Sequence, residues 1–301
     1  MHLRQLEYFS KVARHWSITA AAGELGITQP TLTKSIRLLE QELGVTLFER
    51  LPRGVELTDF GRSLLRHAES VHVQVRDAVR EIDGLRGGAI GHVGIGAGPA
   101  WLRRHLPLAV ARTLSAHPGI RVRIDGGFDD ALLRSLRSGE LDFVVAELPS
   151  PERAGDLRIV PLSSDDLGVC CRSRHPLAGT EVVPAGELLR FPWVMPPRST
   201  RAQARLDALF VARDLPPPEP AVETESMAFL LQLLRHSDAL TFTVRTTLAL
   251  PDGVGLRMLD VPELGAVRQA GIIARADGWL SPAADAVVAE LRAICAVEPQ
   301  N

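Results

Sequence analysis

The sequence predicts an α/β protein in three parts: a small helical N-terminal part, one long central helix, and a larger C-terminal part. Up to residue 85, apolar residues recur at steps of three and four, as they do on the buried face of a helix. Beyond residue 91, short aliphatic runs alternate with helical patterns, which predicts a parallel sheet with right-handed crossovers. The glycine-rich run GLRGGAIG, residues 84–91, predicts a hinge between the two regions.

Composition sets the bounds of the interpretation. A chain of 301 residues is long enough for two or more domains, and 46% hydrophobic residues is ordinary for globular protein. The net charge is −2, and residues 1–57 carry seven basic and six acidic side chains, so any DNA affinity must come from their placement. Three unevenly spaced cysteines favour a reducing cytosol, and no apolar run resembles a signal peptide or a membrane span. We therefore expect a cytoplasmic protein with no membrane contact.

The first two predicted helices are short and apolar on one side. Either Ser17 or Thr19 can cap the second helix, and Gly26 ends it. Small alanines allow the second helix to approach its neighbours closely. The predicted core positions are Leu3, Leu6, Phe9, Val12, Ala13, Ala20, Ala21, Ala22 and Leu25.

The third predicted helix covers residues 28–44 and follows after a short turn. Thr28 is in position to cap it, Pro30 fits its first turn, and Gly44 ends it. Its apolar face holds Leu32, Ile36, Leu39 and Leu43. The outward residues of its first half can all form hydrogen bonds, and none of them is acidic. A helix, a short turn and a second helix with such a start are typical of a helix-turn-helix that enters a DNA major groove.

A β-hairpin is expected next, around Pro52-Arg53-Gly54. Arg50 and Arg53 would lie on or near this wing, within reach of phosphates or of a minor groove. The predicted DNA-contacting residues are Thr28, Gln29, Pro30, Thr33, Lys34, Arg37, Arg50 and Arg53. A solvated helix face is the alternative for Thr33 and Lys34.

The stretch 3–65 resembles the winged helix-turn-helix of the LysR-type transcriptional regulators. The matching residues are Leu3, Phe9, Ser17, Ala20, Ala21, Leu25, Gln29, Pro30, Ile36, Leu39, Glu40, Leu43, Gly44, Leu47, Phe48, Arg50, Leu57, Thr58 and Gly61. That family usually has serine where this chain has Thr28 and Thr33, so the hydroxyl is kept. The resemblance implies that Gln29 and Thr33 read bases, while Lys34 and Arg53 contact phosphates or the minor groove.

The long central helix carries a heptad seam, which is typical of a coiled coil. Its members are Gly61, Leu64, Ala68, Val71, Val75, Ala78, Ile82 and Leu85. A lone helix with so narrow an apolar stripe needs a partner helix, and packing within the same chain is the alternative. The family resemblance implies a dimerising linker helix and a dimer of dimers, that is, a homotetramer.

The C-terminal part resembles the two-lobed effector domain of the same family, akin to periplasmic binding proteins. The expected strands are residues 92–97, 120–126, 141–148, 166–172, 191–196, 222–226, 238–244 and 268–277. The expected helices are residues 101–116, 129–136, 201–212, 227–234 and 281–295. A second set of elements is expected to begin after Pro161.

A ligand is expected between the lobes, where strands end and helices begin. The candidate residues are Gly98, Pro99, Ala100, Trp101, Gly127, Phe128, Arg198, Ser199, Thr200, Ser226, Met227 and Thr243. Arg198 is the expected clamp for a carboxylate; the alternative is that it meets solvent and that the hydroxyls cap helices. We therefore expect a small organic acid as the ligand. Trp101 and Phe128 near the same rim favour a flat or apolar ligand, so an aromatic acid is the narrower expectation.

Enzymatic motifs are not found. GIGAG at 94–98 is not a dinucleotide fingerprint, adjacent Cys170 and Cys171 point to opposite faces of a strand, and the histidines lack metal-ligand spacing. We expect no catalytic residue, no metal and no cofactor. The alternative function is a solute-binding or enzymatic α/β protein with an incidental helical N-terminus.

The complete prediction is an α/β fold with an N-terminal winged helix-turn-helix, a long coiled-coil linker helix, and a two-lobed, periplasmic-binding-protein-like effector domain. The expected domains are 1–58, 59–90 and 91–301, with lobe 1 formed by 91–162 and 267–301 and lobe 2 by 163–266. The expected partners are double-stranded promoter DNA, a small-molecule effector and further copies of the chain.

Overall fold

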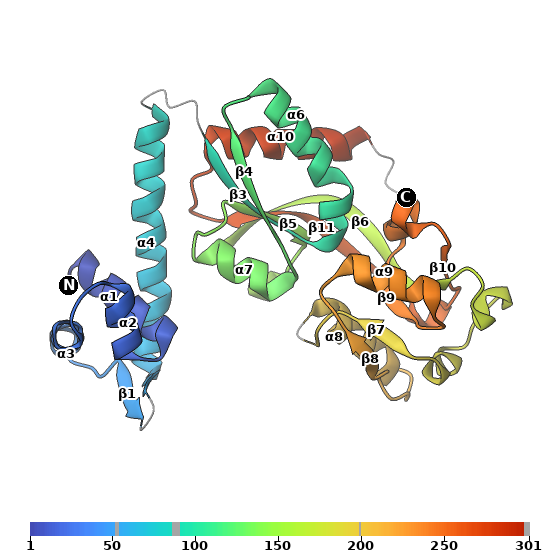
Figure 1. Cartoon of the computed structure of the whole chain (residues 1–301), viewed down its shortest axis with the longest axis horizontal. Helices are drawn as coiled ribbons and strands as arrows, with labels where there is room; N and C mark the ends of the chain where they lie inside the picture. Colours follow the sequence, from blue (N-terminus) through green and yellow to red (C-terminus); the bar gives the residue numbers. More distant parts are fainter. Residues whose placement is uncertain (52–53, 86–90, 199, 298–301) are drawn as a thin grey trace. The chain divides into compact units, whose positions relative to one another are not determined.

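The computed structural model describes residues 1–51, 54–85, 91–198 and 200–297. The chain divides into two compact units, Met1–Leu85 and Arg86–Asn301, and most of their helices and strands are labelled in Figure 1. Among the described residues, no helix combines the length and apolar character that crossing a membrane requires. The described part of the chain also lacks a group of three or more histidine, cysteine, aspartate or glutamate side chains able to hold a metal ion.

The first unit consists of short helices, a β-hairpin and one long helix. These elements are α1 (Leu3–His15), α2 (Ile18–Glu24), α3 (Gln29–Leu43), β1 (Phe48–Leu51), β2 (Gly54–Leu57) and α4 (Asp59–Leu85). Their apolar faces meet in one core, in which Phe9 and Leu32 are fully buried and the rings of Phe9 and Phe48 lie 5.2 Å apart. Three predicted core residues, Leu3, Ala20 and Leu43, are exposed. Leu3 and Leu43 stand at the first and last positions of their helices.

The helix ends of this unit follow the expected chemistry with one exception. Of the two candidate caps for α2, Ser17 is used, and its Oγ accepts from the Ala20 N–H at 3.2 Å. Gly44 ends α3 in the left-handed region, at φ +69°. Thr28 occupies the cap position of α3 but makes no capping bond, because its hydroxyl is bonded to that of Thr31, 2.8 Å away.

The predicted seam of α4 divides into two halves. Leu64, Ala68 and Val71 pack into the core of the first unit. Val75 and Ile82 are 44% and 53% exposed, and so is Val79 at 55%. The alternative of packing within the same chain therefore holds for the first half of the seam. The second half remains an uncovered apolar stripe on the isolated chain.

The second unit is built on a mixed sheet with the strand order β10-β6-β11-β5-β3-β4, to which β9 adds by pairing with β6. Its strands are β3 (His92–Ala97), β4 (Arg121–Gly126), β5 (Phe143–Glu147), β6 (Leu157–Arg172), β9 (Thr241–Val244), β10 (Leu256–Met258) and β11 (Ala266–Arg275). A separate pair is formed by β7 (Trp193–Met195) and β8 (Pro220–Glu223). The expectation of a parallel sheet is correct for β3, β4 and β5 and for β7 with β8, but β6 and β11 run antiparallel to their neighbours.

The boundary expected after Pro161 lies inside a single strand, β6, which continues for 16 residues. Proline has no N–H to donate, so within a sheet it is tolerated at a bulge. The pairing of β6 with β11 is irregular there: Ala270 lies opposite Ser163 and Gly271 opposite Pro161. Gly271 is required at this point because a Cβ would lie 2.2 Å from the carbonyl oxygen of Val160.

The helices of this unit are α5 (Pro99–Arg103), α6 (His105–Ala116), α7 (Asp129–Arg137), α8 (Arg201–Val211), α9 (Met227–His236) and α10 (Pro282–Val297). Short 3-10 turns are formed by Pro151–Arg153, Pro176–Gly179, Ala185–Arg190, Arg245–Ala249, Pro251–Gly253 and Pro262–Leu264. In Figure 1, α6 and α10 lie on one face of β3, β4 and β5, and α7 lies on the other. Both contacts follow from the alternation of side chains along a strand. Phe143 and Val145 of β5 face the apolar core shared with α6 and α10, whereas Val144 and Ala146 face α7.

One expected helix, 101–116, is two helices separated at Arg104, where φ is −123° and ψ is −80°. Pro107 explains the break, since in a continuous helix its ring would clash with the carbonyl of Arg103. Pro107 instead lies in the first turn of α6, where a missing N–H costs nothing.

We call β3–β5 with α5–α7 and α10 lobe 1, and β7–β10 with α8 and α9 lobe 2; β6 and β11 run through both. The core of lobe 2 contains Trp193 and Phe210, whose rings meet edge to face at 6.1 Å. Cys170 and Cys171 lie in different apolar clusters, because successive strand residues point to opposite faces. Burial raises the pKa of Cys170 to about 12 and that of Cys171 to about 11, so both thiols stay protonated and inert.

Candidate functional site

Helix α3 presents a polar surface at its N-terminal half. Gln29, Lys34 and Arg37 are exposed. Within the described residues, neither Lys34 nor Arg37 has an ion-pair partner. The later carboxylate Glu40 is occupied, since its Oε1 accepts from the backbone N–H of Leu47 at 2.8 Å and so ties α3 to the hairpin. The exposed half of α3 therefore offers cations and amides to an anionic partner.

Thr33 is placed differently from the prediction. Its hydroxyl oxygen is buried and has no hydrogen-bond partner among the described residues. The Thr33 side chain is half-buried, at the edge of the face that carries Leu32 and Ile36. The hydroxyl expected at the exposed face is supplied by Thr28 and Thr31, both of which are exposed. In this conformation Thr33 does not present its oxygen to a groove.

The hairpin that forms the expected wing is anchored to the end of α1. Val55 N–H donates to the carbonyl of Trp16 at 2.9 Å, and Gly54 has φ +139°, with Trp16 O 2.3 Å from the position that a Cβ would take. A residue with a side chain does not fit at Gly54. Arg53 and the side chain of Arg50, both predicted to contact DNA, lie outside the described residues.

Charges on α1 and α2 hold those helices together. The carboxylate of Glu24 is bonded to Lys11 and to His15. The hydrogen bonds from Lys11 and His15 lower the pKa of Glu24 to about 2. Lys11 is thereby engaged within the unit, which leaves Lys34 as the lysine on the exposed face of α3.

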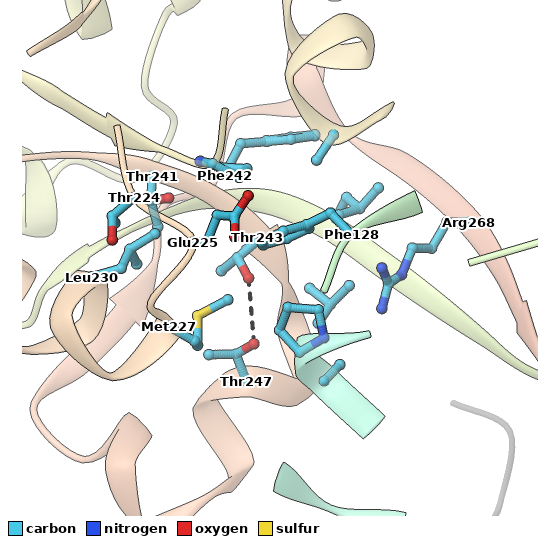
Figure 2. Close-up of a pocket in the computed structure, with 16 residues that line it drawn as sticks. Phe128, Thr224, Glu225, Met227, Leu230, Thr241, Phe242, Thr243, Thr247 and Arg268 are labelled. Atoms are coloured by element: carbon cyan, nitrogen blue, oxygen red, sulfur yellow. Dashed lines mark hydrogen bonds between the residues drawn. The ribbon is translucent and has the colours of Figure 1, made fainter. Parts of the chain in front are cut away.

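A pocket of about 60 Å³ lies in the second unit, between lobe 1 and lobe 2. Most of its lining is apolar, with a group of threonine hydroxyls and two charged side chains (Figure 2). The lining residues are Pro99, Ala100, Phe128, Leu167, Pro196, Ala202, Thr224, Glu225, Met227, Leu230, Thr241, Phe242, Thr243, Val244, Thr247 and Arg268. Segments more than a hundred residues apart in sequence therefore meet around one cavity.

Five of the predicted ligand residues line this pocket, namely Pro99, Ala100, Phe128, Met227 and Thr243. Gly98 and Gly127 are not among the lining residues, and Ser199 lies outside the described residues. Trp101 belongs to the core of lobe 1, where it is 2% exposed. Thr200 and Ser226 cap α8 and α9, accepting from Gln203 and Phe229 respectively. For these two hydroxyls the capping alternative is correct.

Arg198, the expected carboxylate clamp, is not among the residues that line this pocket. Its side chain is 62% exposed, and its Nε lies 3.5 Å from Oε1 of Glu223. The loop before α8 directs it to the surface, where it meets solvent. The arginine that does line the pocket is Arg268, far along the chain on β11.

Arg268 belongs to a buried ionic chain that crosses from lobe 1 to lobe 2. Its Nε and Nη2 lie 3.3 and 3.2 Å from Oδ2 of Asp165, and its Nη1 lies 3.6 Å from Oε2 of Glu147. Glu147, on β5, also accepts from Nη2 of Arg205 on α8 at 2.5 Å. The side chains of Glu147, Asp165 and Arg268 are 7%, 10% and 16% exposed. These charges neutralise one another within the protein.

Further arginines connect the lobes near the same pocket. Arg201 of α8 donates to the carbonyl oxygens of Leu148 and Glu147 at 2.7 and 2.9 Å. Arg103 of α5 forms a two-pronged ion pair with Asp252, and its Nε lies 2.8 Å from Oδ2. The two lobes are thus held together by at least two separate sets of contacts. None of these contacts follows from local sequence pattern, because their partners are about 50 to 150 residues apart.

Comparison with known proteins accounts for both units. Residues 3–62 match the family model described as a bacterial regulatory helix-turn-helix protein of the lysR family, and residues 86–296 match the LysR substrate binding domain. The transcriptional regulator PcaQ of Agrobacterium fabrum is 33% identical over 276 residues, which cover 91% of this chain and 88% of PcaQ. The regulator GbpR of Azospirillum brasilense is 31% identical over 298 residues, covering 97% and 86%.

Solved structures agree in fold. Full-length CbnR in complex with its target DNA has a TM-score of 0.59 and 23% identity, covering 97% of this chain and 99% of CbnR. A full-length OxyR variant from Pseudomonas aeruginosa has a TM-score of 0.61 and 20% identity, covering 97% and 95%. The sequence relatives are regulators and not enzymes. The chain therefore belongs to the LysR family of DNA-binding transcriptional regulators, with a helix-turn-helix and an effector-binding substrate domain.

Proposed function

We propose that α3 enters the major groove of a promoter site and that a small molecule bound between lobe 1 and lobe 2 alters this binding. The first half of this proposal rests on the exposed start of α3, where Lys34 and Arg37 have no ion-pair partner in the part of the chain that the structure describes. Gln29 reads a base edge in this proposal, whereas Lys34 and Arg37 contact phosphates and Arg50 and Arg53 serve the wing. A protein that binds promoter DNA acts in the cytoplasm of a bacterium, so this proposal includes a cytoplasmic location.

Lys34 offers a clean test, because the chain contains only one other lysine, Lys11. Replacing Lys34 by Gln removes a phosphate contact, so affinity for specific and nonspecific DNA should both fall and the salt dependence should become shallower by about one released counterion. Lys11→Gln removes the same charge from a side chain that is bonded to Glu24. It should leave the salt dependence unchanged.

The assay is fluorescence anisotropy of the full chain on DNA from beside its own gene, repeated over a salt series. Gln29→Ala in the same assay should cost about 1–3 kcal/mol on the specific site and relax the preference at one base pair. Equal salt dependences for Lys34→Gln and the parent would contradict the role given to Lys34. An unchanged sequence preference of Gln29→Ala would contradict the role given to Gln29.

We propose in addition that the uncovered stripe of α4 pairs with the same stripe of a second copy, and that two dimers form a tetramer. Val75, Val79 and Ile82 support this proposal, since they are exposed at spacings of four and three residues. Val75→Asp should place a charge in the seam and lower the mass measured by analytical ultracentrifugation. Gln74→Asp adds the same charge beside the seam, where Gln74 is exposed, and should not.

The pocket supports the second half of the proposal because residues from both lobes line it. A ligand that contacts both lobes stabilises one lobe arrangement over others, and that difference in affinity is what shifts an equilibrium. With about 60 Å³ the pocket is far below the roughly 300–1,000 Å³ of drug-sized sites, so entry of such a ligand requires the lobes or side chains to move.

A further inference from the structure

The chemistry of the pocket between the lobes says which class of molecule it takes. Its walls are apolar, with Phe128 and Phe242 as the aromatic members and Leu167, Leu230 and Val244 among the aliphatic ones. Figure 2 shows the threonines and Met227 on one side of Phe128 and Arg268 on the other. An apolar body is therefore the first requirement on the ligand.

The charges of the pocket do not favour an anion. Among the described residues that line it, Arg268 carries the positive charge and Glu225 a negative one. Each nitrogen of the Arg268 guanidinium faces a carboxylate of this chain, Asp165 at 3.2 and 3.3 Å or Glu147 at 3.6 Å. A ligand carboxylate would have to displace a buried carboxylate from Arg268 and would also face Glu225. Burying a charge without a compensating partner is costly.

The backbone on the lobe 1 side adds few donors. Helix α5 begins with Pro99, which has no N–H, and the N–H groups of Trp101 and Leu102 both donate to the carbonyl of Gly98. Pro196, another lining residue, likewise has no N–H to offer. The helix starts that favoured an organic acid from sequence are thus poorly suited to one here.

Hydroxyl groups are the polar feature of the pocket that a ligand can use. Thr243 and Thr247 are 8% and 3% exposed, and their hydroxyl oxygens lie 3.4 Å apart. One hydroxyl proton is used between them, so the pair keeps a second proton and several lone pairs for a ligand. Such groups bond to a hydroxyl, a carbonyl or an amide of an uncharged molecule without the desolvation penalty of a charge.

We infer that the pocket takes an uncharged ligand with an apolar body and one or two hydroxyl, carbonyl or amide groups, bonded at Thr243 and Thr247. The organic acid expected from the sequence is the class that this pocket disfavours. The inference rests on the proposed function, since it names the ligand class of the same site.

Matched probe pairs test the inference directly on the full chain. Benzyl alcohol and benzamide are compared with benzoate, and butanol with butyrate, by the shift of the thermal unfolding midpoint over a concentration series. We expect the uncharged members to raise the midpoint with saturation and to bind at least about tenfold more tightly than their acids. Tighter binding of the acids would overturn the inference, but it would still support the proposal that this pocket binds a ligand. If none of the probes stabilises the chain, the proposal that this pocket binds a ligand fails, and the inference fails with it.

Two variants locate the effect. Thr243→Val keeps the shape of the side chain and should weaken the uncharged probes roughly fivefold. Thr113→Val is the matched control, a buried threonine of α6 outside the pocket whose hydroxyl donates to Ala109, and should leave probe binding unchanged. Glu225→Gln should strengthen binding of the acids while leaving the uncharged probes unaffected. Equal effects of Thr243→Val and Thr113→Val would contradict the role given to Thr243.

Discussion

Removing the charge of Glu147 is the sharpest test of how the lobes are held together. Glu147 on β5 lies between two arginines, Arg205 of lobe 2 and Arg268 of the connecting strand β11. Its side chain is 7% exposed, and those of Arg205 and Arg268 are 28% and 16% exposed. Glu147→Gln keeps the shape but leaves two poorly hydrated guanidinium groups without this counter-charge.

The expected loss follows from the remaining contacts. Breaking a buried ion pair by removing one partner costs about 3–5 kcal/mol. Arg268 retains Asp165 and Arg205 has some access to water, so we expect the lower end, about 3 kcal/mol. For a domain of this size, each kcal/mol shifts the unfolding midpoint by about 2–4 °C, which gives a decrease of about 6–12 °C.

The assay is thermal and urea unfolding of the full chain followed by tryptophan fluorescence. Three of the four tryptophans, Trp101, Trp193 and Trp279, lie in the second unit, and Trp101 and Trp193 are each 2% exposed in the cores of different lobes. The fourth, Trp16, lies in the first unit and is 56% exposed, so the change in the signal reports mainly on the second unit. Glu181→Gln, at an exposed position, is the control and should change stability by less than about 0.5 kcal/mol. If Glu147→Gln lowers the free energy of unfolding by less than about 1 kcal/mol, these ion pairs contribute no more than surface ion pairs do, and the reasoning is refuted.

Three further predictions concern the described residues individually. Gly271→Ala should destabilise the second unit by about 2–3 kcal/mol in urea unfolding, because the new Cβ meets the Val160 carbonyl oxygen. Gly54→Ala should lower the melting temperature of the first unit, followed by helical circular dichroism, through its contact with Trp16 O. Burial lowers the pKa of His175, so the unfolded chain binds more protons below pH 6.5, and stability should fall as the pH decreases from 7 to 5; His175→Gln should flatten that fall in a pH series of urea titrations.

Local pattern was enough for the elements whose burial is set by their own neighbours. The periodicity of Leu32, Ile36 and Leu39 defines α3 and its buried face. The short aliphatic run of β5 predicts a buried strand, and Gly44 marks a helix end. The helix-turn-helix is made of such short-range features, which explains why it was recognisable from the sequence.

Tertiary structure alone decided the pocket and the course of the sheet. Pro161 was predicted to lie at a boundary, yet β6 continues through a bulge next to Pro161, opposite Gly271 of β11, which lies over a hundred residues later in the chain. Arg198 was predicted to bind a ligand carboxylate, but its side chain is exposed to solvent. Arg268 reaches the cavity only because β11 returns between β6 and β5. A side chain's spacing reports which face of its own element it occupies; which distant residues it meets depends on how the chain crosses between the lobes.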